Sequence, residues 1–168
     1  MPPVILGGAS GDSAIYQTLN NYLNNREVFW CPSDSIDRKW PGGLMVISSQ
    51  SASYGFNYAG TGNMPGLGTS GCFSFRNDQT PFFMKKAANV VSPSTCIAAA
   101  DSYHDNLSEL SLYYPNGLQN GNPAEIHNGG SNILFVDGHM KWYKVEDLIS
   151  ARNDIYQMWN YDNTINNY

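Results

Sequence analysis

The spacing of apolar residues along the chain predicts two helical segments. Between residues 12 and 24, apolar side chains recur every three or four positions, as they do on one side of a helix, and Ser10 or Asp12 is placed to cap its start. A shorter helical pattern covers residues 145–152.

Two further segments read as strands. Residues 51–58 alternate, which predicts a strand with aromatic side chains on one face and small or polar ones on the other. The two faces carry Ala52, Tyr54, Phe56 and Tyr58, and Ser51, Ser53, Gly55 and Asn57. Residues 95–100 form a mostly apolar run that ends at Asp101, and such a run is typical of a buried strand.

The clearest local prediction is a β-hairpin over residues 131–143. Asp137-Gly138 suits a two-residue turn, because both residue types tolerate left-handed backbone dihedrals. That turn fixes a register in which four apolar side chains share one face, namely Ile133, Phe135, Met140 and Trp142. We expect this face to be buried against another element.

The organisation along the chain is that of one domain. We see no internal repeat, so we expect residues 1–168 to form a single α+β domain with a mostly antiparallel sheet. Residues 60–71 and 103–122 are rich in glycine or polar residues and are expected to be long loops. The tail from Trp159 is rich in asparagine and reads as polar.

Composition and charge exclude two classes of protein. The net charge is −5, whereas a nucleic-acid-binding protein needs a basic face for phosphates. No apolar run reaches the roughly 18–20 residues of a membrane helix. Charged residues make up only 14 % of the chain, against about 25 % in an average soluble domain. Asparagine, serine and glycine supply the polarity instead, which favours an exported domain.

The three cysteines, Cys31, Cys72 and Cys96, have no pairwise spacing typical of a metal site. The three histidines do not combine with them into a zinc pattern in the sequence. In an exported protein, one disulfide and one buried thiol would be compatible with this number. The sequence does not indicate which two cysteines would pair.

Four separated motifs resemble those of one family, the prepilin-type, processing-associated H-x9-DG family of pilin-like proteins. The first is His127, followed after nine residues by Asp137-Gly138. The others, in chain order, are Phe29-Trp30-Cys31-Pro32-Ser33-Asp34, Ser53-Tyr54-Gly55-Phe56-Asn57-Tyr58, and Ser92-Pro93-Ser94-Thr95 with Ala100-Asp101-Ser102. Their order is kept from about residue 28 to residue 147, so the resemblance covers most of the chain.

The resemblance implies a pilin-like fold, in which an antiparallel sheet with long loops packs on a long N-terminal helix. The family begins with a short basic leader, a cleavage motif and an apolar helix, none of which is found in this chain. We therefore expect the chain to be the globular domain alone. The hairpin face formed by Ile133 and its neighbours is the expected contact for the helix.

The function that the resemblance implies is that of a non-enzymatic pilin or pseudopilin subunit in a type IV pilus-like or type II secretion-like filament. The expected partners are copies of itself, related pseudopilins, a prepilin peptidase and an inner-membrane assembly platform. The expected location is the periplasm, the cell surface or an extracellular filament, with anchoring in the inner membrane before assembly. Contact with the membrane would be made only through the N-terminal helix, and no nucleic-acid partner is expected.

The motif residues are expected to be structural. A strand rises about 3.3 Å per residue, so the segment from Ser131 to Val136 alone spans roughly 17 Å and separates His127 from Asp137. We therefore expect a turn at Asp137-Gly138, a flexible entry at Asn128-Gly129-Gly130, and anchoring of His127 through hydrogen bonds to Asp101 or to a backbone carbonyl. The full set of structural motif residues is His127, Gly129, Gly130, Asp137, Gly138, Cys31, Pro32, Asp34 and Asp101.

Other chemistry has weaker signals. Acidic side chains, first of all Asp101 and Asp105, offer oxygen ligands for Ca²⁺, although no EF-hand spacing occurs; no other cofactor is expected. No nucleophile elbow is present, and Cys31 beside Pro32 reads as a packing or disulfide residue. The alternative function is a surface or secreted module that binds a glycan or cargo through its loops and aromatic residues such as Tyr113, Tyr114 and Trp159.

Overall fold

The structure is a computed structural model. It describes residues 22–23, 25, 27–34, 53–60, 71–72, 87–102, 111–113, 122–150, 152–160 and 162. Of the helix predicted over residues 12–24, only residues 22 and 23 belong to the described residues, and neither is helical. The predicted loop over residues 60–71 lies outside the described residues, apart from its two ends.

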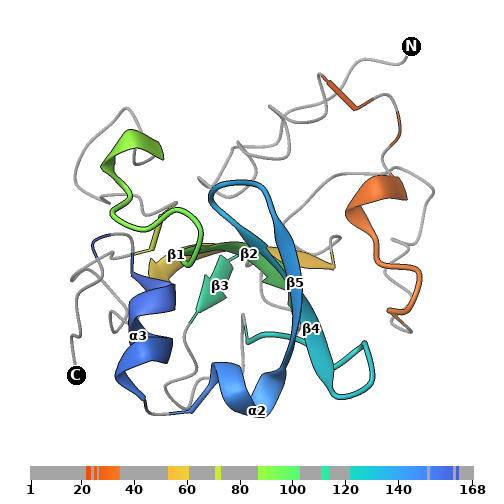
Figure 1. The fold of residues 1–168 in the computed structure, drawn as a ribbon. Helices are drawn as coiled ribbons and strands as arrows, with labels where there is room; N and C mark the ends of the chain where they lie inside the picture. The colour runs from red at the N-terminus through yellow and green to blue at the C-terminus, as the bar shows by residue number, and fades with distance from the viewer. Residues whose placement is uncertain are drawn as a thin grey trace.

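A five-stranded sheet with the order β3-β1-β2-β4-β5 forms the centre of the molecule (Figure 1). Its strands are β1 (Tyr54–Gly60), β2 (Ile97–Asp101), β3 (Ser111–Tyr113), β4 (Gly130–Phe135) and β5 (Met140–Lys144). Neighbouring strands are antiparallel, except that β3 runs parallel to β1. The described helical elements are η1 (Glu27–Phe29), η2 (Ala87–Asn89), α2 (Val145–Leu148) and α3 (Asn153–Trp159).

This architecture confirms the α+β class and the mostly antiparallel sheet. The prediction of an uninterrupted loop over residues 103–122 is wrong, because β3 lies within it. Residues 145–152 do contain a helix, but α2 ends at Leu148 and a separate helix, α3, follows. Among the described residues, no helix combines the length and the apolar character needed to cross a membrane.

The central strand β2 is buried along its whole length, as its apolar sequence predicts. It lies between β1 and β4, so both of its edges are paired with neighbouring strands. On one face, α2 and α3 complete the larger core cluster (Figure 1). That cluster consists of Ile97, Ala100, Ile133, Phe135, Leu148, Ile155 and Trp159.

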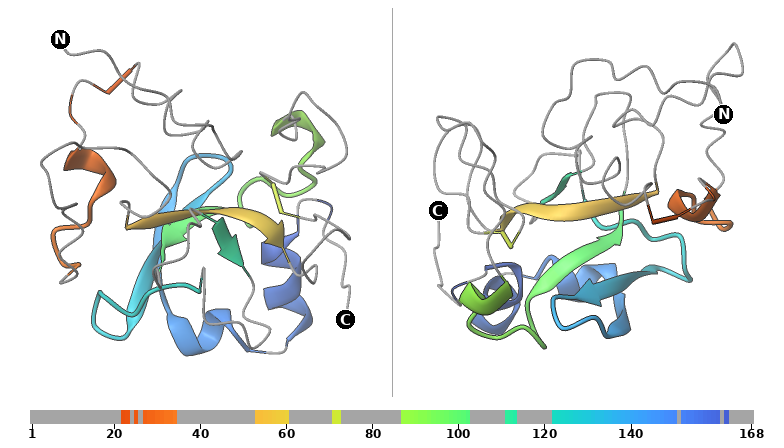
Figure 2. Two further views of the ribbon diagram at one scale, coloured as in Figure 1. Left: turned by 180° about the vertical axis from the view of Figure 1, so that it is seen from behind. Right: turned by 90° about the horizontal axis from the view of Figure 1, so that it is seen from above.

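The opposite face of the sheet carries a second, smaller cluster. It contains Cys72, Val90, Cys96 and Ala98, with Leu134 and Val136 partly buried against it. The segment around η2 lies on this side, across the sheet from α3 (Figure 2). The two clusters make the sheet the middle layer of the described part of the chain.

In β1, the small and polar face is the more deeply buried one. Ser53, just before the strand, and Asn57 are both 0 % exposed, whereas Tyr54 and Phe56 are partly exposed. The side-chain amide of Asn57 donates hydrogen bonds of 2.8 Å to the carbonyl oxygens of Ile97 and Trp159. A buried amide with both bonds made holds β1, β2 and the end of α3 together.

The hairpin forms where predicted, but its predicted register is wrong by one residue. The loop contains three residues rather than two: the Phe135 N–H donates to the His139 carbonyl, and the Gly138 N–H donates to the Phe135 carbonyl. Gly138 has a φ of 94°, which is the left-handed conformation that closes such loops. Leu134 therefore lies opposite Met140, and Ile133 opposite Lys141.

A shift of one residue exchanges the two faces of β5. Ile133 and Phe135 are buried as expected, with 0 % and 2 % exposure, but Met140 and Trp142 are 65 % and 48 % exposed. Tyr143 packs against the larger core instead. The apolar face predicted for the hairpin is therefore split between the two sides of the sheet.

The polar tail predicted from Trp159 also needs correction at its first residue. Trp159 is 0 % exposed and belongs to the larger core cluster. Its indole N–H donates to the carbonyl oxygen of Leu148 at 3.3 Å, so it also joins α3 to α2. A residue buried in this way is not free to stack on a glycan.

The register makes opposite predictions for two apolar residues of the hairpin. Replacing Ile133 by alanine should lower the free energy of unfolding by about 2–5 kcal/mol, because it opens a cavity in the core. Met140→Ala should change it by no more than about 0.5 kcal/mol, because the side chain is exposed. Chemical denaturation of both variants measures these values. An equal loss in the two variants would contradict the register.

Candidate functional site

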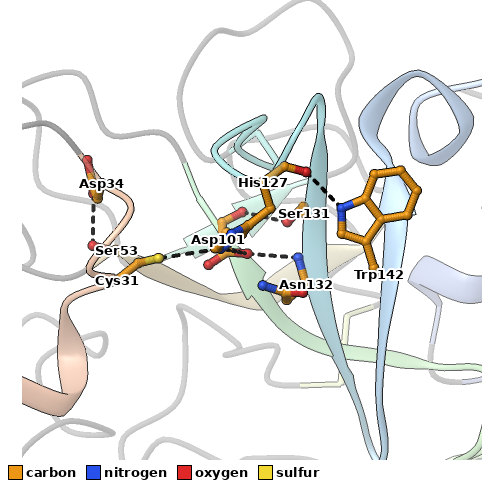
Figure 3. Close-up of polar contacts among 8 residues, drawn as sticks. All are labelled: Cys31, Asp34, Ser53, Asp101, His127, Ser131, Asn132 and Trp142. Carbon is orange, nitrogen blue, oxygen red and sulfur yellow. Dashed lines mark hydrogen bonds and ion pairs between the residues drawn. The ribbon is translucent and has the colours of Figure 1, made fainter.

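Residues from all four motifs meet at one end of the sheet, where β1 and β4 begin and β2 ends (Figure 3). Tyr54 pairs with Asp101 across β1 and β2. The backbone N–H of Asn132 in β4 donates a 2.7 Å hydrogen bond to Oδ2 of Asp101. The end of β2 thus carries a carboxylate that contacts the neighbouring strand through its side chain.

Asp101 lies at the centre of this junction. Its carbonyl oxygen accepts hydrogen bonds from the Ala124 N–H at 2.8 Å and from the Ser131 hydroxyl at 3.2 Å, and the residue is 1 % exposed. Burial raises the pKa of its carboxyl group, while the Asn132 N–H and the charge of His127 act in the opposite direction. The side chain is therefore held in one place in an environment that disfavours an isolated negative charge.

His127 reaches Asp101 from a tight turn. The N–H of each of His127 and Gly130 donates to the other's carbonyl, at 3.1 and 3.2 Å, and both residues between them have positive φ, 55° at Asn128 and 75° at Gly129. Two left-handed residues in succession define a type I′ turn, for which Asn-Gly is the favoured pair. The segment expected to be a flexible entry, Asn128-Gly129-Gly130, therefore forms a defined turn in the structure.

The imidazole of His127 faces two groups at once. Its Nε2 lies 3.3 Å from Oδ2 of Asp101 and 3.4 Å from Sγ of Cys31. The predicted anchoring of His127 by Asp101 is confirmed by the first distance. The contact with Cys31, which is 96 positions away in the chain, was not predicted.

Cys31 is positioned by the turn that follows η1. The Asp34 N–H donates to the Cys31 carbonyl at 2.9 Å, and the hydroxyl of Ser53 donates to Oδ2 of Asp34 at 2.8 Å. The Ser53 N–H also donates to the Phe29 carbonyl at 2.9 Å. Cys31, which is 5 % exposed, is therefore held close to the start of β1. Pro32, the next residue of the turn, is exposed.

Tyr54, the first residue of β1, shares this environment. Burial raises the pKa of its phenol, and the negative charges that Cys31, Asp101 and Asp34 carry when ionised raise it further. The junction thus gathers several groups that carry negative charge when ionised. His127 is the only basic side chain that the described contacts place among them.

Trp142 covers the turn that carries His127. Its indole N–H donates a 2.8 Å hydrogen bond to the His127 carbonyl (Figure 3). A Cβ atom placed on Gly130 would clash with this indole, so a larger residue would have to displace it. Gly130 is therefore required for close packing, whereas Gly129 is required by its positive φ.

Asp137 and Gly138 have their own partners in the hairpin loop. Oδ1 of Asp137 lies 2.6 Å from Nδ1 of His139 and accepts the His139 N–H at 3.1 Å. The hydrogen bond from this N–H is the main cause that lowers the pKa of Asp137, and the His139 side chain adds to it. The described contacts thus agree with the expected separate roles of His127 and Asp137, with Asp137 serving the turn.

The structure brings together Cys31, Asp101 and His127, a grouping that no local spacing in the sequence reveals. Ser53 and Trp142 were also missed as parts of the junction, although Ser53 belongs to a quoted motif. All three cysteines lie in the described part of the chain and are buried, and no disulfide joins any two of them. Of the two calcium candidates, Asp105 lies outside the described residues, and Asp101 has sulfur and nitrogen neighbours.

The packing of Trp142 on Gly130 predicts a specific coupling. Gly130→Ala should displace the indole, break its bond to the His127 carbonyl and lower the free energy of unfolding by about 1–3 kcal/mol. The same substitution in a Trp142→Ala background should cost clearly less, because the clash is gone. Denaturation curves of the four proteins measure both costs. Equal costs in the two backgrounds would show that the indole does not lie on Gly130.

Similarity to known proteins does not identify the function of this site. The chain matches no protein-family model, no curated protein and no solved structure. What the chain can do is therefore argued from the junction of Cys31, Asp101 and His127 and from the sheet that carries it.

Proposed function

We propose that this chain is a non-enzymatic, pilin-like or pseudopilin-like subunit of a type IV pilus-like or type II secretion-like filament. The observation that carries the proposal is the convergence of the four motifs on one end of the sheet. Residues that are far apart in the chain, Cys31, Asp101 and His127, contact one another there. These contacts between separate motifs hold the turns at that end of the sheet against one another.

The proposal requires a surface on which an N-terminal helix can pack. In pilin-like folds, the N-terminal helix packs on one face of the antiparallel sheet. The face with Ile133 and Phe135 is already covered by α2 and α3, so it does not suit that helix. The second core cluster covers part of the opposite face, but it leaves Met140 and Trp142 of β5 exposed, so we assign the helix to that side of β5.

The exposure of β5 supports this assignment. Met140 and Trp142 are two of the large apolar side chains that lie exposed in the described part of the chain, and they are next-but-one neighbours on the same strand. Covering side chains of this size contributes roughly 1.5–3 kcal/mol for each one fully buried. A long apolar helix against β5 would gain this energy.

The partners and the location follow from the same proposal. The subunit would associate with copies of itself and with related pseudopilins, after a prepilin peptidase has processed it at the inner membrane. It would then take part in a filament in the periplasm or at the cell surface. Its contact with the membrane would be made by the N-terminal helix before assembly.

Cell fractionation tests the proposal. In the organism that encodes the chain, filaments sheared from the surface or released from the envelope should contain its peptides by mass spectrometry. Deleting the prepilin peptidase gene should leave an unprocessed, larger form in the membrane fraction and none in filaments. An unchanged size and distribution of the protein in that deletion strain would contradict the proposal.

Variants separate assembly from folding. Met140→Ser should reduce the amount of the protein in filaments while the total amount stays similar. Ile149→Ser is the matched control, because Ile149 is also an exposed apolar residue, 41 % exposed, but follows α2 on the other side of the sheet. Equal effects of the two substitutions on assembly would contradict the assigned helix contact.

A further inference from the structure

The thiol, carboxylate and imidazole at the end of the sheet form a group of three metal-ligating side chains. One ligand atom from each of Cys31, Asp101 and His127 lies within 4.8 Å of the other two. The residues come from the turn after η1, the end of β2 and the turn before β4. These segments are fixed to one another by backbone hydrogen bonds, so the three groups are held in place by the fold.

The carboxylate provides an independent observation that points to a cation. Oδ2 of Asp101 accepts the Asn132 N–H, but Oδ1 is buried and accepts no hydrogen bond from any described group. A buried carboxylate oxygen without a donor is costly, and such atoms are rare in folded proteins. A cation held between the three side chains would compensate this charge.

The contacts of His127 also favour a cation over a hydrogen-bonded relay. Cys31 and Asp101 both approach the same ring nitrogen, Nε2. One nitrogen cannot donate its proton to the carboxylate and accept a proton from the thiol at the same time. A catalytic triad places the nucleophile and the carboxylate on different ring nitrogens, so this arrangement is not that of a Cys–His–Asp nucleophile.

The donor atoms and their spacing indicate which metal fits. Zinc prefers sulfur, nitrogen and carboxylate ligands at roughly 2.0–2.3 Å in a tetrahedron, which places neighbouring ligand atoms roughly 3.3–3.7 Å apart. The distances from Nε2 of His127 to Oδ2 of Asp101 and to Sγ of Cys31 are 3.3 and 3.4 Å. Calcium, by contrast, takes six to eight oxygen ligands.

We propose that Cys31, Asp101 and His127 bind one Zn²⁺ ion, with a water molecule in the fourth position. On binding, the thiol of Cys31 loses its proton to the solvent and coordinates as the thiolate. The 26 % exposure of the His127 side chain leaves a side from which the ion and the water can enter. The ion would hold the turn after η1 and the turn before β4 against the end of β2.

Zinc titration tests the site directly. The purified chain, treated with a chelator and kept under a thiol-free reductant, should bind one equivalent of Zn²⁺ by calorimetry, and zinc should raise its melting temperature. Co²⁺ should give the near-ultraviolet charge-transfer absorption of a cobalt–thiolate bond. Failure to bind zinc, or binding of Ca²⁺ in its place, would overturn the proposal.

A pair of cysteine variants identifies the ligand. Cys31→Ala should abolish the cobalt–thiolate band and weaken zinc binding at least about tenfold. Loss of a residue that only supports a metal ligand already weakens metal binding by about 10–100-fold, so loss of a direct ligand should weaken it at least as much. Cys72→Ala is the matched control, since Cys72 is also 5 % exposed but lies in the second core cluster. It should keep both the band and the affinity.

A third variant covers loss of folding. If circular dichroism shows that Cys31→Ala does not fold, His127→Gln should still fold and lose the same zinc affinity. Unchanged zinc binding in the folded Cys31→Ala or His127→Gln protein would contradict the proposal, as would an equal loss in Cys72→Ala.

Discussion

The buried carboxylate of Asp101 is the constraint on which the junction at the end of the sheet depends. A carboxylate that is 1 % exposed is stable only where donors or positive charge surround it. The Asn132 N–H supplies one donor, and His127 supplies the only basic group among the contacts that the described residues make with it. His127 reaches this carboxylate from the tight turn at residues 127–130. The same turn is covered by Trp142, which lies over Gly130.

The positions of strands were easier to predict from the sequence than the face of the sheet on which each side chain lies. The buried strand at residues 97–101 was predictable because a central strand needs apolar residues on both faces, and the hairpin was predictable from its turn residues. Asp-Gly fits both a two-residue turn and a three-residue loop closed by a glycine, however, and only the fold decides between them. The one-residue difference moved Met140 and Trp142 to the opposite face.

The site was predictable only in part. The tie between His127 and Asp101 followed from two motifs that belong together, but Cys31 lies 96 residues from His127 and shares no spacing with it. Asn128-Gly129 was read as flexible because glycine is permissive, although the same pair favours a defined turn. Trp159 was misread because its sequence neighbours are polar, while its burial depends on packing against Leu148.

A double-mutant cycle on Asp101 and His127 tests the central claim most directly. The free energies of unfolding of the wild type, Asp101→Asn, His127→Gln and the double variant, measured with a chelator present, give the coupling between the two side chains. The structure predicts a favourable coupling of about 0.5–3 kcal/mol, as for residues in direct contact. A coupling of zero would show that the Asp101 carboxylate does not hold His127 in place.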